Sequence, residues 1–382
     1  MLTRSLTIVT SYPMDEPVVR NRLTPLIDRA VARGFRVRLV SSGTTTLDDD
    51  RPGFRHDRLG AVATPQRNFV RRAIDEWRAA KAILQSVRTT PEDIVLVTIP
   101  SMFLLFRVGL LSGGRKLLDV RDLTWEYLPD SQPLQRAAKL LFRHLAHGRF
   151  GSFDLISCTN ERERAYLANK LRIAPSEIVL VPNGIAQSQF DLLAPNGIRR
   201  ADALEVSYIG NVGVAQNLSI LLRAAQMLPK VRFNIVGGGT ALTEISMLRK
   251  SMALDNVHMT GRIAWDEVRS IYNRTHILYA QLSANFEGAM PSKLYEYLST
   301  GKYVVYGGGG EARKMLARFD NNVVIDPDDP DALVQAIRDA ARDGADRRLS
   351  LRNREAIEAS FIREHASDRL LDRMIEQFNL IA

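Results

Sequence analysis

The chain has 382 residues, of which 45% are hydrophobic and 25% charged. These proportions exclude a disordered or fibrous protein, and the length predicts two domains. Lys and Arg number 52 against 43 Asp and Glu, and the formal charge of +9 favours anionic partners such as phosphorylated substrates, anionic lipid or nucleic acid. A single cysteine, Cys158, excludes an internal disulfide framework and indicates a reducing compartment.

Apolar runs typical of strands alternate with helical patterns through the first half of the chain. The runs are SLTIVTS, FRVRLVSS, DIVLVTI, RKLLDV and FDLISC. Residues 1–12 have a short apolar run and no small-residue cleavage pattern, so we predict a first strand rather than a signal peptide, and a cytoplasmic chain. The long apolar run over residues 94–111 contains Pro100 and Arg107, which favours a buried strand followed by a helix over a membrane span.

Two basic amphipathic stretches lie in this half, NFVRRAIDEWRAAKAIL and LQRAAKLLFRHLAHGRF. They combine Phe69, Trp77, Phe142 and Phe150 with Arg71, Arg72, Arg78, Lys139, Arg143 and Arg149. Such helices suit peripheral contact with an anionic membrane at the inner face of the plasma membrane. The alternative interpretation is that their apolar faces are core and their charges a solvated rim.

After the turn Pro182, Asn183, Gly184 the alternation restarts. The strand-like runs are EVSYIG, VRFNIVGGG, VHMTG, HILYAQL, KYVVYGG and NVVIDP. Continuous apolar strands belong to parallel sheets covered on both faces, so the fold class predicted is α/β, with two doubly wound Rossmann-like domains facing each other across a cleft. The predicted domains are residues 1–182 and residues 183–360, with a final helix over 361–382 that packs back on the first domain.

Loops after the carboxyl ends of parallel strands are expected to carry the site. Small and polar residues gather there in the second half: Gly210, Asn211 and Gly213, then Gly237 to Gly239, then Gly307 to Gly310. The predicted ligand-binding residues of these loops are Gly210, Asn211, Gly213 and Gly237.

Residues 291–316, PSKLYEYLSTGKYVVYGGGGEARKML, predict a helix, a strand and a glycine-rich turn. We expect the helix to begin at Pro291. Its apolar face would carry Leu294, Tyr297 and Leu298, and its polar face Ser292, Glu296 and Ser299. The first-turn amides of Ser292, Lys293 and Leu294, with the Lys293 ammonium, would hold a phosphate, and Glu296 would accept hydrogen bonds from ribose. The alternative is an amphipathic surface helix with a solvated Glu.

The motifs PSKLYEYLSTGK, VPNGI, YIGNVGVAQNLSILLRAA and FNIVGGG give the chain a family resemblance. It resembles the GT4 glycosyltransferases, which have the GT-B fold, closely over residues 178–329 and more loosely over the first half, including LDVRDLTWEYLP. The resemblance implies that Glu296 binds the ribose of a nucleoside-diphosphate sugar, with a UDP-sugar expected, and that Pro291, Ser292 and Lys293 hold the diphosphate. It also implies metal-independent transfer, with retention, to a glycan or lipid-diphosphate acceptor in bacterial cell-surface polysaccharide or glycolipid synthesis. Residues 1–182 would then bind the acceptor, and residues 183–360 the donor, through loops that include Gly210, Asn211, Gly213 and Gly237.

The sequence departs from the family pattern at two places. The family's paired glutamates are spaced by eight, whereas Gly288 stands eight before Glu296 and Glu287 lies one residue earlier. Many members carry Arg and Lys after the first glycine turn, where this chain has Gln216 and Asn217. We expect Lys293 to supply the missing cation, and Arg262 to be the second candidate unless it is a plain surface arginine.

Metal ligation and catalysis depend on a few acids. The sequence Asp326, Pro327, Asp328 resembles a metal-binding Asp-x-Asp, but Asp329 before Pro330 predicts a helix N-cap, so neither a metal nor a cofactor is expected. In the first half, the loop after RKLLDV carries Asp119, Arg121, Asp122 and Glu126. We predict that Asp122 contacts the transferred sugar; alternatively, it is a capping or salt-bridged aspartate beside Arg121.

Three rival functions are weaker. A non-hydrolysing sugar-nucleotide epimerase shares the two-domain architecture but needs an acid and a base on opposite faces of one sugar carbon, and no second acid besides Glu296 is clearly placed. A dinucleotide-dependent oxidoreductase rests on Gly237 to Gly239 alone. Nucleic-acid binding rests on net charge alone, because no recognised motif is present, and no nucleic-acid partner is predicted.

Overall fold

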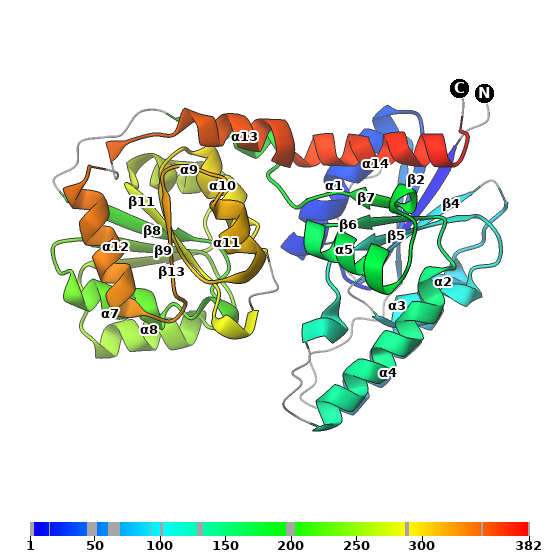
Figure 1. The fold of residues 1–382 in the computed structure, drawn as a ribbon, viewed down its shortest axis with the longest axis horizontal. Coiled ribbons are helices and arrows are strands. Elements are labelled where there is room, and N and C mark those ends of the chain that lie inside the picture. Colours follow the sequence, from blue (N-terminus) through cyan, green and yellow to red (C-terminus); the bar gives the residue numbers. More distant parts are fainter. Residues whose placement is uncertain are drawn as a thin grey trace. The chain divides into compact units, whose positions relative to one another are not determined.

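The computed structural model describes residues 4–14, 16–43, 52–59, 69–91, 93–99, 102–127, 133–195, 203–286, 290–344 and 347–380. The chain divides into two compact units (Figure 1). Unit 1 comprises Met1–Asn183 and Arg363–Ala382, and unit 2 comprises Gly184–Ile362. Each unit is a parallel sheet with helices on both faces, which confirms the prediction of two doubly wound α/β domains.

Unit 1 contains a seven-stranded sheet in the order β3-β2-β1-β4-β5-β6-β7. The strands are β1 (Ser5–Val9), β2 (Arg36–Ser42), β3 (Phe54–Leu59), β4 (Ile94–Ile99), β5 (Arg115–Val120), β6 (Leu155–Cys158) and β7 (Ile178–Leu180). All pairings are parallel, and β1 lies between β2 and β4. The strand order therefore reverses between β1 and β4, the position where doubly wound folds bind ligands.

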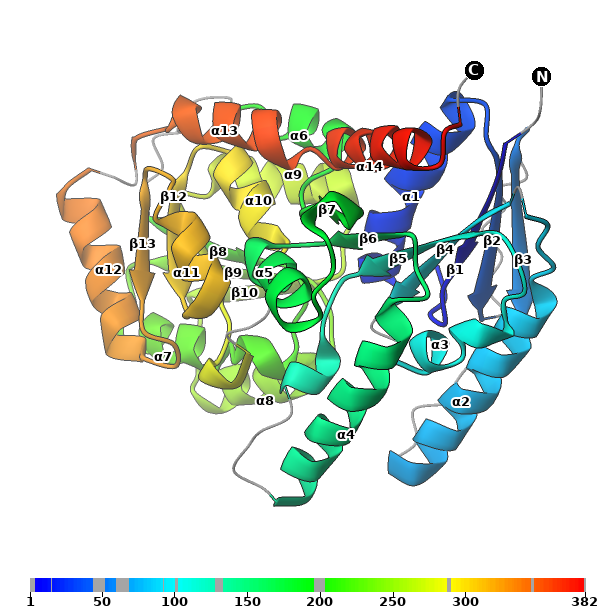
Figure 2. The ribbon, with the colours of Figure 1, turned by 45° about the vertical axis from the view of Figure 1, so that its right-hand side comes forward.

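The helices of unit 1 cover the two faces of this sheet (Figure 2). They are α1 (Pro17–Ala32), α2 (Phe69–Ser86), α3 (Met102–Phe106), α4 (Pro133–Phe150), α5 (Glu161–Lys170) and α14 (Arg363–Gln377). One core layer lies under α2, α3, α4 and α5, and the other under α1 and α14. Among the described residues, no helix has the length and hydropathy to cross a membrane.

The last helix, α14, is part of unit 1 although it follows the whole of unit 2 in the chain. Its buried Leu370, Leu371 and Met374 join the core beneath α1. On the rim, Arg29 and Arg33 of α1 donate hydrogen bonds to Asp368 at 2.9 and 2.8 Å. Burial of three large apolar side chains is the main attraction here, because exposed ion pairs contribute about 1 kcal/mol or less each.

Unit 2 contains a six-stranded parallel sheet in the order β10-β9-β8-β11-β12-β13. The strands are β8 (Glu205–Ile209), β9 (Arg232–Val236), β10 (Val257–Gly261), β11 (Ile277–Gln281), β12 (Tyr303–Gly307) and β13 (Asn322–Ile325). One face is covered by α7 (Ser219–Met227), α8 (Leu242–Ser251) and α12 (Pro330–Arg342). The other is covered by α6 (Gln187–Leu192), α9 (Trp265–Arg274), α10 (Lys293–Ser299), α11 (Gly310–Leu316) and α13 (Leu351–Phe361).

Candidate functional site

Helix α10 is fixed against the carboxyl end of β8 by one buried tyrosine. The Tyr297 hydroxyl accepts a hydrogen bond from the Ile209 amide at 2.8 Å and donates one to the Ile209 carbonyl at 3.0 Å. Ile209 is the last residue of β8, so this pair satisfies backbone groups where the strand ends. The start of α10 is thereby held beside the glycine turn that follows β8.

The predicted start of this helix at Pro291 is wrong by two residues, because α10 begins at Lys293. The Leu294 amide donates to the Pro291 carbonyl at 3.2 Å, and the Tyr295 amide to the Ser292 carbonyl at 3.2 Å. These bonds span three residues, which is the tight geometry common at helix ends. The Leu294 amide is therefore already used, and only the Ser292 and Lys293 amides have no acceptor among the described residues.

The polar face predicted for this helix is also smaller than expected. Ser299 is buried and donates to the Glu296 carbonyl at 2.7 Å, so it faces the protein and not solvent. Leu294 is fully buried in the core of unit 2, as predicted for the apolar face. Ser292 is exposed and Glu296 half-buried, so these two, with Lys293, remain to meet a ligand.

Glu296 is oriented by a residue of the neighbouring helix. The hydroxyl of Tyr272, on α9, donates to Glu296 Oε2 at 3.0 Å. Burial, together with the charge of Glu296, raises the pKa of Tyr272 well above its ordinary value, so the hydroxyl stays protonated as a donor. A carboxylate can accept about four hydrogen bonds, so the Tyr272 bond orients Glu296 without by itself saturating it.

The Lys293 side chain lies against the end of β8 rather than in open solvent. Its ammonium is 3.8 Å from the centre of the Tyr208 ring and donates a hydrogen bond to the Tyr208 hydroxyl. That hydroxyl in turn donates to the Asn211 carbonyl. Burial lowers the pKa of Lys293 to about 7, and the charge of Glu296 acts in the opposite direction. The cation is thus held in place at the edge where a donor phosphate is expected.

Three loops meet at this edge because glycine lets their backbones approach. A Cβ on Gly237, whose φ is +134°, would lie 1.9 Å from the Gly210 carbonyl oxygen. A Cβ on Gly210 would lie 2.8 Å from Lys293 Cε. Arg262, exposed after β10, packs its side chain against Gly238. Lys293, Gly210, Gly237 and Arg262 therefore follow one another along the carboxyl ends of β8, β9 and β10.

The two residues that replace the family's Arg and Lys shape the loop after β8. Gln216 Oε1 accepts hydrogen bonds from the Gly213 amide at 3.1 Å and from Asn211 Nδ2 at 3.4 Å. Asn217, at a positive φ of 37°, donates from Nδ2 to Asp328 Oδ1 at 2.7 Å. Gln216 Oε1 and Asn217 Nδ2 are therefore engaged by other parts of the chain.

The acids of the Asp-x-Asp sequence are separately engaged. Asp326 pairs with Arg313 at 3.1 Å, and Asp328 Oδ1 accepts from Gln281 Nε2 at 3.1 Å besides Asn217. Asp329 accepts from the Ala332 amide at 2.9 Å at the start of α12, which confirms the predicted N-cap. No group of three or more His, Cys, Asp or Glu residues that could hold a metal occurs in the described part of the chain.

Two predicted site residues, Glu287 and Asp122, do not lie among the described residues of the unit 2 site. Glu287, the candidate for the first family glutamate, and Gly288 lie outside the described residues. Asp122 belongs to unit 1, where it follows β5 and is half-buried. Its charge acts on Glu163, a buried acid of α5 that the sequence analysis did not single out.

Glu163 Oε2 accepts hydrogen bonds from the Thr159 amide and hydroxyl, both at 2.8 Å. Burial raises the pKa of Glu163 to about 7. The Glu163 amide donates to Asn160 Oδ1 at 2.9 Å, so the backbone of this residue is capped by Asn160 while its carboxylate binds Thr159, one residue before the cap. Sequence could have revealed it, since Asn160 and Glu163 have the spacing of a capping box.

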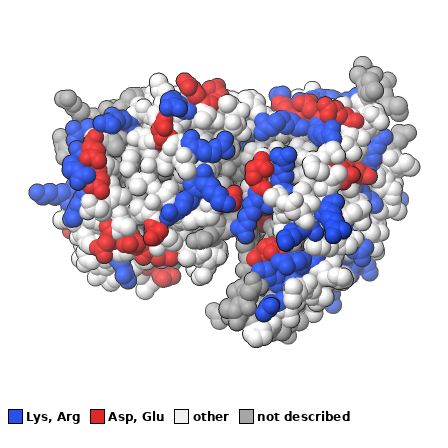
Figure 3. Space-filling view, viewed as in Figure 1, with Lys and Arg blue, Asp and Glu red and all other residues white. Residues whose placement is uncertain are grey.

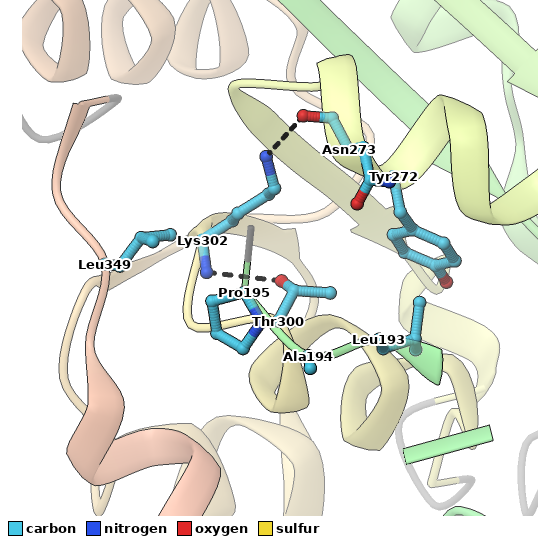
Figure 4. Close-up of a pocket in the computed structure, with 8 residues that line it drawn as sticks. All are labelled: Leu193, Ala194, Pro195, Tyr272, Asn273, Thr300, Lys302 and Leu349. Carbon is cyan, nitrogen blue, oxygen red and sulfur yellow. Dashed lines mark hydrogen bonds between the residues drawn. The ribbon is translucent and has the colours of Figure 1, made fainter. Parts of the chain in front are cut away.

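A small pocket lies at the opposite edge of the unit 2 sheet, before the strands begin (Figure 4). Leu193, Lys302 and Leu349 are among its walls. Lys302 donates to the carbonyls of Asn273 at 3.2 Å and Thr275 at 2.5 Å, and burial lowers its pKa to about 8. These bonds join the loops before β11 and β12, so this lysine has a structural role.

Comparison with known families matches both halves of the chain. Residues 19–189 match the model described as Glycosyltransferase Family 4, and residues 196–356 match the model described as Glycosyl transferases group 1. The gpi3 subunit of phosphatidylinositol N-acetylglucosaminyltransferase from Schizosaccharomyces pombe is 27% identical over 156 residues. That match covers 39% of this chain and 33% of the curated relative, about a third of its length.

Solved structures share the fold over nearly the whole chain. Sucrose-phosphate synthase from Thermosynechococcus elongatus has a TM-score of 0.76 at 18% identity, over 99% of this chain and 100% of that chain. Anabaena HepE in complex with UDP-glucose has a TM-score of 0.69 at 12% identity, over 97% and 99%. WaaG, a glycosyltransferase of lipopolysaccharide biosynthesis, has a TM-score of 0.64 at 13% identity, over 95% of each chain.

Proposed function

Because this chain is a glycosyltransferase of the GT4 type with the GT-B fold, we propose that it moves a sugar from a nucleoside-diphosphate sugar to a glycan or lipid-linked acceptor. The observation that carries the proposal is the arrangement at the carboxyl edge of the unit 2 sheet. There Lys293 lies against Gly210, and Glu296 is oriented by Tyr272 one turn further along α10. A cation and a carboxylate at this spacing suit a diphosphate and a ribose.

Each group has a proposed role in donor binding. Glu296 accepts hydrogen bonds from the ribose hydroxyls, in the way an acid does in other doubly wound folds. Lys293 pairs with the diphosphate, and the Ser292 and Lys293 amides supply two further donors. Gly210 and Gly237 let the donor approach the backbone. Arg262, exposed on the next loop, is the second cation.

The donor is proposed to be a UDP-sugar. Structures of Anabaena HepE have been determined with UDP and with UDP-glucose, and HepE shares the fold over nearly its full length. This supports uracil as the base of the donor. The transferred sugar would then lie beyond the diphosphate, and Asp122 of unit 1 stays the proposed contact to its hydroxyls.

The proposed reaction retains the anomeric configuration and needs no metal. The bond between the anomeric carbon and the phosphate oxygen breaks, the acceptor oxygen binds that carbon, and the acceptor proton passes to the leaving phosphate. Negative charge grows on that phosphate in the transition state, and Lys293 is the group proposed to neutralise it. Preorganised donors and cations of this kind typically contribute a few kcal/mol each.

Thermal unfolding with UDP, GDP and dTDP sugars tests the function. We expect one nucleotide sugar to raise the melting temperature, because a ligand that binds only the folded state stabilises it. Glu296→Ala should weaken the binding of that nucleotide sugar by about tenfold or more, because hydrogen bonds to a charged group are lost. The matched control is Glu358→Ala on the exposed side of α13. No shift with any nucleotide sugar would contradict the proposed function.

Peripheral membrane contact is the proposed setting, and α4 supports it. The helix has no acidic residue, and Leu140, Leu141 and Leu145 are 53%, 56% and 44% exposed. These leucines lie on the side opposite the core residues Ala146 and Phe150, so the core does not account for them. Figure 3 shows Lys and Arg side chains across the same part of unit 1. Apolar and cationic groups together suit an anionic bilayer.

The α4 surface extends to α2 through packed aromatic rings. Phe142 of α4 stacks on Phe106 of α3 at 6.1 Å between ring centres, and Phe103 contacts Trp77 of α2 at 5.8 Å. Trp77 is 39% exposed. Phe69, Arg71 and Arg72 lie at the start of α2, and their side chains are outside the described residues.

Flotation with vesicles tests the membrane contact. We expect binding to vesicles rich in phosphatidylglycerol and none to pure phosphatidylcholine. Leu141→Ser combined with Leu145→Ser should abolish flotation without changing nucleotide binding, whereas Met247→Ser, at a 67% exposed position of unit 2, should not. The parent protein could instead fail to float and form concentration-dependent dimers that the double variant does not form. That result would identify a second copy of the chain as the partner of these leucines.

A further inference from the structure

Arg121 is the first residue after β5, at the carboxyl edge of the unit 1 sheet. Its amide donates to the Ile99 carbonyl at the end of the adjacent β4. Its charge also interacts with Tyr12, in the loop that follows β1. Arg121 therefore lies beside the point between β1 and β4 where the strand order reverses, which is where open parallel sheets bind ligands.

The guanidinium of Arg121 is buried yet uncommitted. The residue is 8% exposed, and its side chain makes no hydrogen bond or ion pair with any described residue. Its nitrogens are not among the buried atoms sealed from solvent. The five N–H donors of a buried arginine are normally hydrogen-bonded, because a buried charged group without hydrogen bonds is costly. The N–H donors of Arg121 therefore remain available to an acceptor atom of a bound ligand.

Arg22, whose charge acts on Arg121, is by contrast fully engaged in hydrogen bonds. It donates to Asp119 Oδ1 at 2.6 Å and Oδ2 at 3.3 Å, and to the Val181 carbonyl at 2.7 Å. These bonds tie α1 to β5 and to the end of β7. Arg22 is thus a structural arginine, and its three bonds account for its position.

Asp119 cannot serve Arg121 as well, because its acceptor sites are taken. Oδ1 accepts from Arg22 and from Ser157 at 2.7 Å, and Oδ2 accepts from Arg22 and from Thr98 at 3.3 Å. A carboxylate offers about four lone-pair sites, and four hydrogen bonds fill them. The nearest buried acid therefore leaves Arg121 with charge attraction only.

We propose that Arg121 anchors a binding site in unit 1 for a phosphoryl group of the acceptor, an inference that rests on the proposed function. The planar fork of a guanidinium matches two phosphate oxygens at once. Asp122, the next residue, adds a negative charge near the site. A phosphoryl group offers two oxygens to such a fork, and the proposed lipid-linked acceptor carries one, so the acceptor class is a phosphorylated or diphosphate-linked one.

Calorimetric titration of the full chain tests the site. The protein is first saturated with UDP, so that the donor site is occupied, and then titrated with inorganic pyrophosphate or with geranyl diphosphate. We expect binding that Arg121→Gln weakens by about tenfold or more, because charge-assisted hydrogen bonds are lost. Arg88→Gln, an exposed arginine before β4, should bind like the parent. Stronger binding of geranyl diphosphate would assign the phosphate to a lipid, and equal binding to a soluble acceptor.

Thermal unfolding separates a ligand site from a structural role. An arginine without partners can be replaced at little cost, so Arg121→Gln should melt within a degree or two of the parent, whereas Arg22→Gln should melt clearly lower. A loss of stability in Arg121→Gln equal to that of Arg22→Gln, or unchanged diphosphate affinity, overturns the proposal. Because UDP binding is read on the same samples, failure of the donor site is recognised separately.

Discussion

Lys293 is the residue whose charge state should set the pH range of donor binding. Its pKa of about 7 means that it is an ammonium below neutrality and increasingly neutral above it. A cation that pairs with the donor diphosphate is therefore lost as the pH rises through 7. We expect the affinity for UDP, measured by calorimetry, to fall between about pH 6 and pH 8, that is, over about two units around this pKa.

Two variants isolate the lysine in this experiment. Lys293→Met should bind UDP more weakly and without this pH dependence. Tyr208→Phe removes the hydroxyl that accepts from the ammonium, so it should move the midpoint to lower pH while the ring contact remains. A parent protein whose pH profile coincides with that of Lys293→Met would exclude the lysine from donor binding.

At the level of elements, the turns that follow β8 and β9 contact each other, and this contact requires glycine more strictly at Gly237 than at Gly210. A Cβ on Gly237 would meet the backbone oxygen of Gly210, whereas a Cβ on Gly210 would meet the end of the flexible Lys293 side chain. Gly237→Ala should therefore lower the free energy of unfolding by about 2 kcal/mol or more. Urea denaturation should find Gly210→Ala less destabilised, with weaker UDP binding. Equal stability of Gly237→Ala and the parent would contradict this.

The cap of α12 offers a second test at this level. Asp329→Ala removes the acceptor for the Ala332 amide and should lower the free energy of unfolding by about 1 kcal/mol. Asp326→Ala is the control, because its 84% exposed side chain forms a surface ion pair with Arg313, which contributes little. Urea titrations of both proteins measure the difference, and similar losses would mean that the cap is not the source.

The strands of unit 1 that the sequence predicted are the central ones, whose residues are largely buried. β4, IVLVTI, is buried at every position and was plain from its apolar run. Both edge strands of unit 1 were missed: β3, FRHDRL, is largely half-buried and charged, and β7 has only three residues. An edge strand needs less apolar side-chain area, so its pattern is weak. In unit 2 both edge strands were predicted, because β10 (VHMTG) and β13 (NVVI) keep apolar residues in their runs.

For the candidate site, sequence indicated the charged residues but not what orients them. Lys293 and Glu296 follow from the PSKLYEYL motif, whereas Tyr208 and Tyr272 read only as strand and helix residues. Their hydroxyls matter because the fold brings β8 and α9 against α10, a tertiary contact that no local pattern encodes. Arg121 shows the same limit: only the structure shows that Asp119 is fully used by other donors.

For the whole molecule, the two units should respond separately to core damage and to ligand. Leu371 on α14 is fully buried in unit 1, so Leu371→Ala should cost about 2 to 5 kcal/mol. Differential scanning calorimetry should show the transition of unit 1 moving to lower temperature, while UDP still raises the transition of unit 2. Leu351→Ala, at a 59% exposed position, is the control. A parallel shift of both transitions would mean that the units unfold together.

The position of α14 also bears on how the protein is made. The β-strands of unit 1 leave the ribosome first, yet the helix that covers the core beneath α1 is translated only after all of unit 2. Until then the apolar surface that receives Leu370, Leu371 and Met374 has no cover. Domains commonly fold in the order of synthesis, and exposed apolar surface favours aggregation. Here the unit synthesised first is the last to be completed, so we expect the nascent unit 1 to need protection from aggregation throughout the synthesis of unit 2.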